Sequence, residues 1–168
     1  GLHNRRYAMP HVTRIAERAQ RTGKPFALMI ADMDHFKRIN DQYGHAAGDA
    51  VLIEVANRLR GNLRAVDLVA RIGGEEFLMV LPGVTLKNAR AAAKRLCRRV
   101  GTPALAIPGQ SQPINATISI GLVVCDTDTG LPRGMALTAA ALLDRADRAL
   151  YDAKAEGRNR VTLCRPAA

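Results

Sequence analysis

The sequence predicts an α/β sandwich in which helices flank a central, mostly antiparallel sheet of five strands. Three observations predict this class. Helical and strand patterns alternate along the chain, residues 26–31 are apolar at every position as in a strand buried on both faces, and strand-like segments at 68–72 and 77–81 flank two glycines. With 168 residues, 48% of them hydrophobic, the chain (1–168) has the size of a single domain with one core.

The first helix is expected over residues 4–21. An approximate apolar stripe has helical spacing, arginines cover the opposite face, and Gly23 is a typical end signal. The stripe consists of Tyr7, Val12, Ile15, Ala16 and Ala19.

Two carboxylates, Asp32 and Asp34, directly follow the strand at 26–31. Asp34 is expected to cap a short helix, which leaves backbone N–H groups near residues 35–37 free to hold phosphate oxygens. The alternative is an ordinary capped helix without a ligand.

A bend at 44–49 leads into the next helix, whose first turn carries Asp49. A carboxylate at that position can simply offset the helix dipole. The apolar side of this helix consists of Val51, Leu52, Val55, Ala56 and Leu59.

Gly73 and Gly74 connect the two strand-like segments. Glycines supply the positive φ values that a two-residue turn requires, so we expect a β-hairpin with Glu75 and Glu76 at its tip. These two carboxylates either form a solvated acidic turn or have a cation nearby. If this hairpin lies beside the strand at 26–31, Asp32 and Glu75 can meet as hard oxygen ligands for Mg²⁺ or Mn²⁺.

The second half of the chain continues the alternation of helices and strands. A very basic helix is expected from 86 to 100, a loop from 102 to 113, and a strand with one core face from 114 to 121, where apolar residues alternate with polar ones. The last elements are a polar loop at 126–134 to which no chemistry is assigned, a helix at about 139–155 and a short strand at 161–164.

The net charge of +10 favours anionic partners such as nucleotides, nucleic acid or an acidic domain. Nucleic-acid binding has little further support, because stacking side chains are scarce: the chain has no Trp, three Tyr and three Phe.

Cys97, Cys125 and Cys164 are far apart and lack the spacing of metal ligands, so buried thiols are expected. No apolar run approaches the roughly 18 residues that span a bilayer, and no signal-peptide pattern occurs.

The segment Gly73-Gly74-Glu75-Glu76-Phe77, together with the carboxylates after the first strand, resembles the signature of GGDEF domains, the catalytic domains of diguanylate cyclases, in the Gly-Gly-Glu-Glu-Phe variant. Similar motifs extend from residues 1–6 to residues 151–159, which is nearly the whole chain. The resemblance implies the fold of nucleotidyl cyclases and polymerase palm domains. The Asp-x-Leu-Thr motif that precedes this region in the family is absent, so we expect a fragment whose N-terminal sensor, receiver or dimerising region lies upstream.

The resemblance implies a metal site with catalytic carboxylates. Asp32, the backbone carbonyl of Met33 and Glu75 would hold two Mg²⁺ (or Mn²⁺) ions in each half-site, and Glu76 would complete the acidic pair. Glu75 and Glu76 are the implied catalytic residues, and the sequence leaves open which of them takes a proton.

The resemblance also implies a set of contacts to the substrate. Asn40 and Asp49 would contact guanine, whose edge offers an Asp two N–H donors that adenine lacks, while Lys154 and Arg158 would hold the triphosphate. Basic residues at a helix C-terminus are also expected simply because they favour its dipole. The implied substrate contacts are His35, Phe36, Lys37, Asn40, His45, Asp49, Lys154 and Arg158.

An inhibitory product site is implied at Arg64 and Asp67, with Arg95 on the following helix as a third member. The guanidinium would fork onto guanine O6 and N7, and the carboxylate would accept guanine N–H groups. The alternative is a turn-stabilising salt bridge, worth at most about 1 kcal/mol when exposed.

The expected function is that of a diguanylate cyclase, a nucleotidyltransferase. It would condense two GTP into cyclic di-GMP and two pyrophosphates in a C₂ dimer of half-sites, with product inhibition. The alternatives are a catalytically weak domain that binds GTP or cyclic di-GMP, an enzyme that makes mixed or adenine cyclic dinucleotides, and, least favoured, a nucleic-acid binder.

The expected partners are GTP, cyclic di-GMP, a second copy of the domain and an upstream sensor or receiver domain. Neither nucleic acid nor direct membrane contact is expected. The expected location is the bacterial cytoplasm, with the full-length protein either free or attached to the inner membrane.

Overall fold

The computed structural model describes residues 2–126 and 138–164. Residues 127–134 of the expected polar loop, and Gly1 of the first motif, lie outside these ranges. The elements are, in chain order, β1 (His3–Asn4), α1 (Arg5–Thr22), β2 (Phe26–Met33), α2 (Phe36–Tyr43), α3 (His45–Gly61), β3 (Leu68–Arg71), β4 (Glu76–Pro82), α4 (Leu86–Gly101), β5 (Ile118–Cys125), α5 (Ala139–Ala155) and β6 (Val161–Leu163).

The predicted mixed α/β fold is confirmed, but the sheet has six strands rather than five, in the order β1-β3-β4-β2-β5-β6. β2 is central and antiparallel to both β4 and β5, whereas the β1–β3 and β5–β6 pairs are parallel. The additional strand, β1, is only two residues long. A strand of that length shows no alternation, so the sequence pattern could not predict it.

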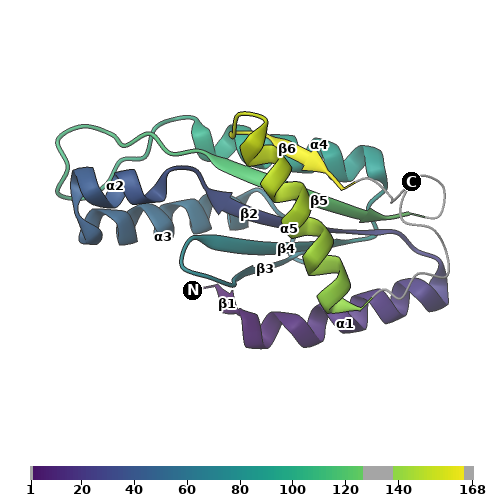
Figure 1. The fold of residues 1–168 in the computed structure, drawn as a ribbon. Helices are drawn as coiled ribbons and strands as arrows, with labels where there is room; N and C mark the ends of the chain where they lie inside the picture. The colour runs from purple at the N-terminus through teal and green to yellow at the C-terminus, as the bar shows by residue number, and fades with distance from the viewer. Residues whose placement is uncertain (1, 127–137, 165–168) are drawn as a thin grey trace.

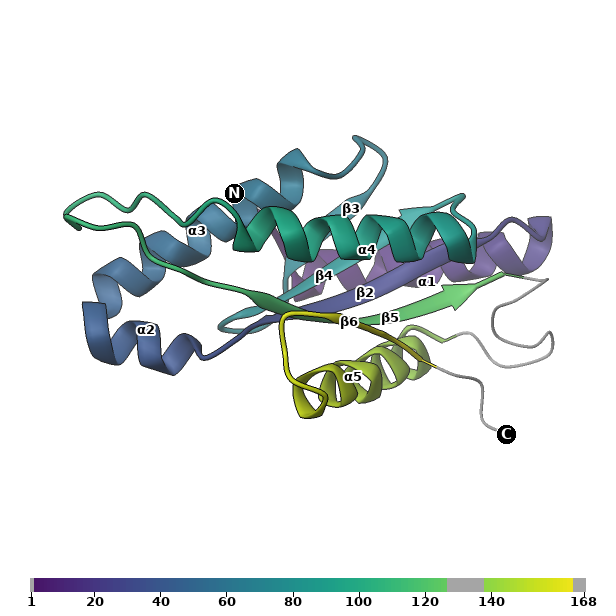
Figure 2. The same ribbon diagram turned by 90° about the horizontal axis from the view of Figure 1, so that it is seen from above.

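Helices cover both faces of the sheet (Figures 1 and 2). Alternate residues of a strand point to opposite faces. Phe26, Leu28 and Ile30 of β2 therefore belong to the core cluster that includes residues of α1 and α5. Their neighbours Ala27, Met29 and Ala31 belong to the cluster that includes residues of α2, α3 and α4. Burial on both faces explains why β2 is apolar at nearly every position.

The first helix begins and ends close to the predicted bounds. The Asn4 side chain accepts a hydrogen bond from the N–H of Tyr7, and Gly23 ends the helix with a left-handed φ of 71°. Tyr7 was expected in the apolar stripe, but it is 44% exposed. Its ring stacks on His3, with 3.8 Å between the ring centroids, so this part of the expectation is wrong.

The strand expected at 114–121 lies four residues further along, as β5. Ile114 makes only an isolated bridge to Leu105. All eight residues of β5 are buried, not one face only, because the strand lies between β2 and β6 with helices on both sides of the sheet. The polar Ser119 is tolerated there because its hydroxyl donates a 2.6 Å hydrogen bond to Asp34 Oδ1.

Two of the three thiols are buried as expected, those of Cys97 and Cys125, whereas Cys164 is half-buried. Burial raises the pKa of the Cys97 and Cys125 thiols to about 12. Both thiols are therefore protonated at neutral pH.

Gly121 in the middle of β5 sets the distance between the sheet and α5. A Cβ atom at this position would lie 2.1 Å from the carbonyl oxygen of Ala146 and 2.4 Å from the backbone nitrogen of Leu150. Only glycine allows this approach, so helix α5 packs directly on the sheet backbone.

Replacing Gly121 with Ala should destabilise the domain by about 3 kcal/mol, the upper range of overpacking, because the clash is with backbone atoms that cannot rotate away. The measurement is the urea midpoint of unfolding. Gly61→Ala is the matched control, since a Cβ there meets no atom within 4 Å. An unchanged midpoint in Gly121→Ala would contradict the close approach.

Candidate active site

Asp32 and Glu76 lie side by side at the end of β2. Their Cα atoms are partners in the antiparallel β2–β4 register. Directly opposite residues of two strands point to the same face. For Asp32 and Glu76 this is the face that α1 and α5 cover, since Ile30 and Leu28 of the same strand pack there.

Lys154, in the last turn of α5, lies against this acidic end of the sheet. Its Nζ atom is 3.1 Å from Asp32 Oδ1, in an ion pair. Asp32 is only 7% exposed, and Oδ1 accepts no hydrogen bond of good geometry within the described ranges. A buried carboxylate oxygen that accepts no well-aligned hydrogen bond can bind a cation without first losing such a bond.

The turn between β3 and β4 is wider than the predicted two-residue hairpin. The N–H of Ile72 donates to the carbonyl of Glu76 at 3.0 Å, and neither Gly73 nor Gly74 has a positive φ. The Arg71 side chain stabilises this turn instead, since its Nη2 donates to the carbonyl of Gly74 at 2.6 Å. The two-residue turn was therefore a wrong prediction, and Glu76 is the first residue of β4 rather than part of a tip.

Glu75 precedes β4 and is tied to β2 through its backbone. Its carbonyl accepts a 3.2 Å hydrogen bond from the N–H of Met33. This bond brings the turn next to Asp32, as the metal-site prediction requires.

The carboxylates at this end of the sheet disfavour their own ionisation. Burial raises the pKa of Asp32, and the charge of Asp34 adds to the rise, against the lowering effect of Lys154. Burial also raises the pKa of Glu75 and of Glu76, and the charge of Asp32 raises both further. Among the described residues, the ammonium of Lys154 is the one charge that acts in the opposite direction on each of them.

These shifts set how stability depends on pH. The folded domain binds protons more readily than the unfolded chain, so this cluster destabilises the fold above its raised pKa values, and its penalty decreases as pH falls through them. Cation binding has the opposite requirement, because the ligands must be ionised. The cluster therefore costs stability at neutral pH when no cation is bound.

The residues fit a divalent cation that takes only part of its ligands from the protein. No group of three or more His, Cys, Asp and Glu side chains in residues 2–126 and 138–164 is arranged to hold a metal by itself. Mg²⁺ usually takes one or two carboxylates and completes its shell with waters and substrate phosphates. Asp32 and Glu75, with the Met33 carbonyl, match that incomplete set.

Asp34 does not cap α2, so this prediction was wrong. The residue at the N-cap is His35, with a left-handed φ of 54° and no side-chain capping bond. The Asp34 carboxylate instead accepts bonds from the hydroxyls of Thr117 and Ser119 and from the N–H of Asn159. The first N–H groups of α2 nonetheless lack intrahelical partners, as in any helix, so Phe36 and Lys37 can still donate to phosphate.

The residues expected to contact guanine lie on α2 and α3. Asn40 is half-buried on α2, while His45 and Asp49 are exposed on α3. We predicted Asp49 in the first turn of this helix. Because α3 begins at His45, Asp49 lies in the second turn, so this prediction was wrong. A Cβ at Gly48 would lie 1.8 Å from Asn40 Oδ1, so this glycine makes room for the Asn40 side chain.

Arg64 and Asp67 form the ion pair that was the alternative to a product site. Arg64 Nη2 lies 2.7 Å from Asp67 Oδ1, and Asp67 Oδ2 accepts a 2.7 Å bond from the backbone N–H of Arg64. The Asp67 side chain is 2% exposed, against 50% for Arg64. Arg95 lies nearby on α4 and donates to the carbonyl of Asn62 at 3.3 Å. Product binding by these residues remains a prediction.

The sequence patterns missed three residues that shape the site: Arg71, Thr117 and Ser119. Thr117 and Ser119 alternate at the start of β5 just as Asp32 and Asp34 do at the end of β2. Two alternating polar pairs at strand ends were therefore a signal that the strands lie side by side.

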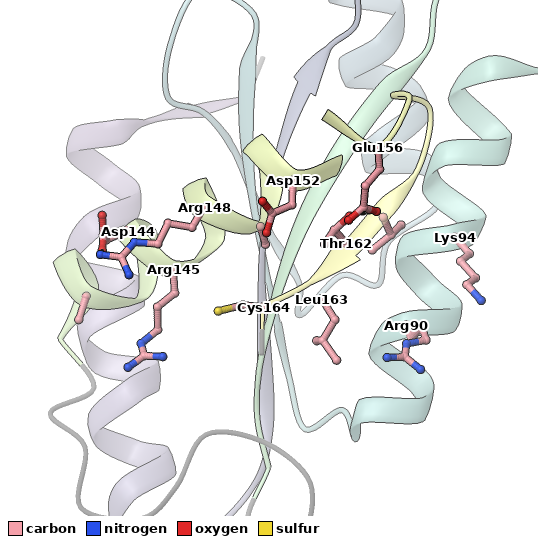
Figure 3. A pocket seen from close by; sticks show the side chains of 13 residues that line it. Arg90, Lys94, Asp144, Arg145, Arg148, Asp152, Glu156, Thr162, Leu163 and Cys164 are labelled. Atoms are coloured by element: carbon pink, nitrogen blue, oxygen red, sulfur yellow. Dashed lines mark hydrogen bonds and ion pairs between the residues drawn. The ribbon is translucent and has the colours of Figure 1, made fainter. Parts of the chain in front are cut away.

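A hollow lies elsewhere in the described ranges, along β6 at the far edge of the sheet. It has a volume of about 810 Å³. Arg90 and Lys94 of α4 line one side, and Asp144, Arg145 and Arg148 of α5 line the other (Figure 3). None of the predicted site residues lines it, so this hollow is separate from the candidate site.

The described ranges contain no helix that is long and apolar enough to cross a membrane.

Comparison with known proteins identifies the family of the chain. The family model for the GGDEF domain of diguanylate cyclases matches residues 1–160. Response regulator PleD of Caulobacter vibrioides is 42% identical over 161 residues, which cover 96% of this chain and 34% of that protein. The chain thus spans about a third of this relative's length.

Two solved structures are similar to the fold. The active GGEEF domain of a diguanylate cyclase from Vibrio cholerae is 30% identical with a TM-score of 0.86, and the match covers 99% of this chain and all (100%) of that one. The GGDEF domain of DgcB from Caulobacter crescentus, in complex with cyclic di-GMP, is 29% identical with a TM-score of 0.86, and the match covers 97% and 89% of the two chains.

The family match extends over almost the whole chain, and a relative that is 42% identical supports it. The chain therefore belongs to the GGDEF domain family of diguanylate cyclases.

Proposed function

We propose that this domain is a diguanylate cyclase that condenses two GTP into cyclic di-GMP and releases two pyrophosphates. The observation that carries the proposal is the acidic end of β2, where the buried Oδ1 of Asp32 lies in an ion pair 3.1 Å from Lys154 Nζ and accepts no hydrogen bond of good geometry in the described ranges. Carboxylates that need a cation, next to an ammonium, suit a metal-bound polyphosphate. The similar structure from Vibrio cholerae is described as an active GGEEF domain, which is the signature variant that this chain has.

In this proposal Asp32, the Met33 carbonyl and Glu75 hold Mg²⁺ or Mn²⁺, two ions in each half-site, and Glu76 completes the acidic pair. The bound metal supplies positive charge that offsets the charge on the α-phosphate and on the leaving pyrophosphate. The first N–H groups of α2 and the side chains of Lys154 and Arg158 hold the triphosphate.

The chain's own residues then orient the reactants. Asn40, His45 and Asp49 hold guanine, so that the ribose 3′-hydroxyl of one GTP faces the α-phosphorus of the other. A carboxylate of the Glu75–Glu76 pair accepts the 3′-hydroxyl proton, the new O–P bond forms, and the bond to pyrophosphate breaks.

One domain binds one GTP in this scheme, so two domains must face each other with C₂ symmetry. We also propose that the domain, 1–168, is part of a longer cytoplasmic protein with an upstream sensor or receiver region. The relative PleD is named a response regulator, and this chain matches only 34% of it.

Product inhibition at Arg64, Asp67 and Arg95 is the last part of the proposal. The exposed half of the Arg64 side chain is the accessible group, since Asp67 is only 4% exposed. Cyclic di-GMP would have to take over part of the Arg64–Asp67 ion pair in order to bind.

Incubation with GTP and Mg²⁺ should yield cyclic di-GMP and pyrophosphate, identified by mass. The rate per enzyme molecule should rise with enzyme concentration, because a larger fraction of the domains is then dimeric.

Asp32→Asn and Glu75→Gln should each lower turnover at least about a thousandfold, since metal charge stabilisation of several kcal/mol is lost. Asp144→Asn, an exposed acid on α5, is the control and should stay active. GTP binding without product in the wild-type protein would favour the binding-module alternative.

Asp49→Ser should relax the preference for GTP over ATP. We expect a change of at least about tenfold in the ratio of kcat/KM values, below the roughly 10⁴-fold of a buried polar pocket because Asp49 is exposed. Asp41→Ser, the same change at an exposed position of α2, is the control. Equal selectivity in the Asp49 variant and the wild type would exclude Asp49 as the guanine contact.

Arg64→Ala should raise the inhibition constant for cyclic di-GMP about tenfold or more, because a charge-assisted contact to guanine is lost. The matched control is Arg60→Ala, which removes hydrogen bonds to the carbonyls of Arg64 and Asp67 in the same turn. If the Arg60 variant shifts the constant equally, the turn rather than the Arg64 side chain is responsible. An unchanged constant in Arg64→Ala rules out the site.

A further inference from the structure

The segment that follows α5 has an unusual backbone. Gly157, Arg158 and Asn159 have φ values of 126°, 62° and 47°, three consecutive residues with positive φ. Glycine adopts such values freely, but a residue such as arginine is strained at them. The surrounding structure must therefore hold Arg158 in this conformation.

Hydrogen bonds from three directions fix this segment, which we define as the 156–160 loop. The N–H of Arg158 donates to the carbonyl of Ala153 at 3.0 Å, which closes the end of α5. The N–H of Ile120 in β5 donates to the carbonyl of Arg160 at 2.9 Å. Between these two backbone bonds, the N–H of Asn159 donates to Asp34 Oδ2 at 3.0 Å. Within the loop, Arg160 Nε donates to the carbonyl of Arg158 at 3.0 Å, and Asp34 supplies a side-chain contact to the strained part from outside the loop.

The Asp34 carboxylate is itself held rigidly. It is 5% exposed. Thr117 Oγ1 donates to its Oδ2 at 2.7 Å and Ser119 Oγ donates to its Oδ1 at 2.6 Å. Bonds to a carboxylate are stronger than those between neutral groups, and a fully satisfied buried group keeps one geometry. The end of β2, the start of β5 and the 156–160 loop are therefore joined at one side chain.

Asp34 connects the carboxylates of the candidate site to its basic residues. It follows Asp32 by two residues, at the same end of the central strand. The 156–160 loop carries Arg158 and begins just after Lys154, whose ammonium lies 3.1 Å from Asp32 Oδ1. One strand end therefore bears a cation-binding carboxylate and also fixes the basic loop beside it.

We propose that Asp34 is a positioning residue that fixes the 156–160 loop through the Asn159 N–H and so holds Arg158 and Lys154 in place for the β- and γ-phosphates of the nucleotide. This inference rests on the proposed function for the identity of the ligand. Asp34 touches neither the nucleotide nor the cation in this role. It acts through the backbone of the loop.

The experiment compares Asp34→Ala, Asp34→Asn and Ser119→Ala with the wild type. The amide oxygen of Asn can accept the bonds from Asn159 and Thr117 while its NH₂ group donates to the Ser119 hydroxyl, so Asp34→Asn should preserve the loop. Ser119→Ala removes a bond of the same kind from the carboxylate without touching the loop, and so controls for lost stability. Asp34→Ser is too short to reach the loop and replaces Asp34→Ala if that variant does not fold.

Two measurements test the role separately. Amide hydrogen exchange reports the protection of the Asn159 N–H without any nucleotide. Affinities for 3′-deoxy-GTP, which lacks the attacking hydroxyl and cannot react, and for GMP report contacts to the β- and γ-phosphates. In Asp34→Ala we expect loss of Asn159 protection, about tenfold weaker binding of 3′-deoxy-GTP, and GMP binding within about twofold of wild type. Asp34→Asn and Ser119→Ala should keep both properties.

The inference is overturned if Asn159 stays protected in Asp34→Ala, if 3′-deoxy-GTP and GMP weaken equally, or if Ser119→Ala has the same effect. A wild-type protein that does not bind 3′-deoxy-GTP would refute the proposed function, and with it the role at the phosphates. Hydrogen exchange would still decide whether Asp34 fixes the loop.

Discussion

The desolvation and mutual repulsion of three carboxylates at the end of β2, one buried and two half-buried, are the constraint on which the rest of this structure depends. Asp32 and Glu76 are forced together by the β2–β4 register, and Glu75 is tied to Met33 by a backbone bond. Burial raises the pKa of all three carboxyl groups. Such a cluster lowers the stability of the free domain, and in the proposed function the bound cation and nucleotide would restore it.

Lys154 moderates this repulsion because α5 lies unusually close to the sheet. Gly121 allows that approach, since any side chain at its position would meet the backbone of α5. The ammonium then lies in an ion pair with Asp32. In the proposed function Asp32 would hold the cation and the Lys154 ammonium would contact phosphate, so the same lysine would act in the free and in the bound states.

Polar side chains inside the sheet are tolerated because they are paired with one another. Asp34, Thr117 and Ser119 come from adjacent strands and satisfy each other with short hydrogen bonds. The ion pair of Arg64 and Asp67 follows the same rule at the other end of β3. Its carboxylate is fully engaged, so any ligand at Arg64 must compete with an existing interaction.

The sequence by itself determined the class of the fold, the bounds of α1 and α5, the strand at 26–31 and the acidic residues that follow it. These features depend on periodicity and end signals that act within a few residues, as Asn4 and Gly23 do for α1. Only the tertiary structure decided that β1 joins the sheet, that β5 begins at Ile118, that the turn before Glu75 is wide, and that Asp34 bonds to residue 159 rather than to α2. In each case the deciding hydrogen bonds join residues brought together by strand pairing or side-chain packing, and no local pattern records which of several available partners a polar group takes.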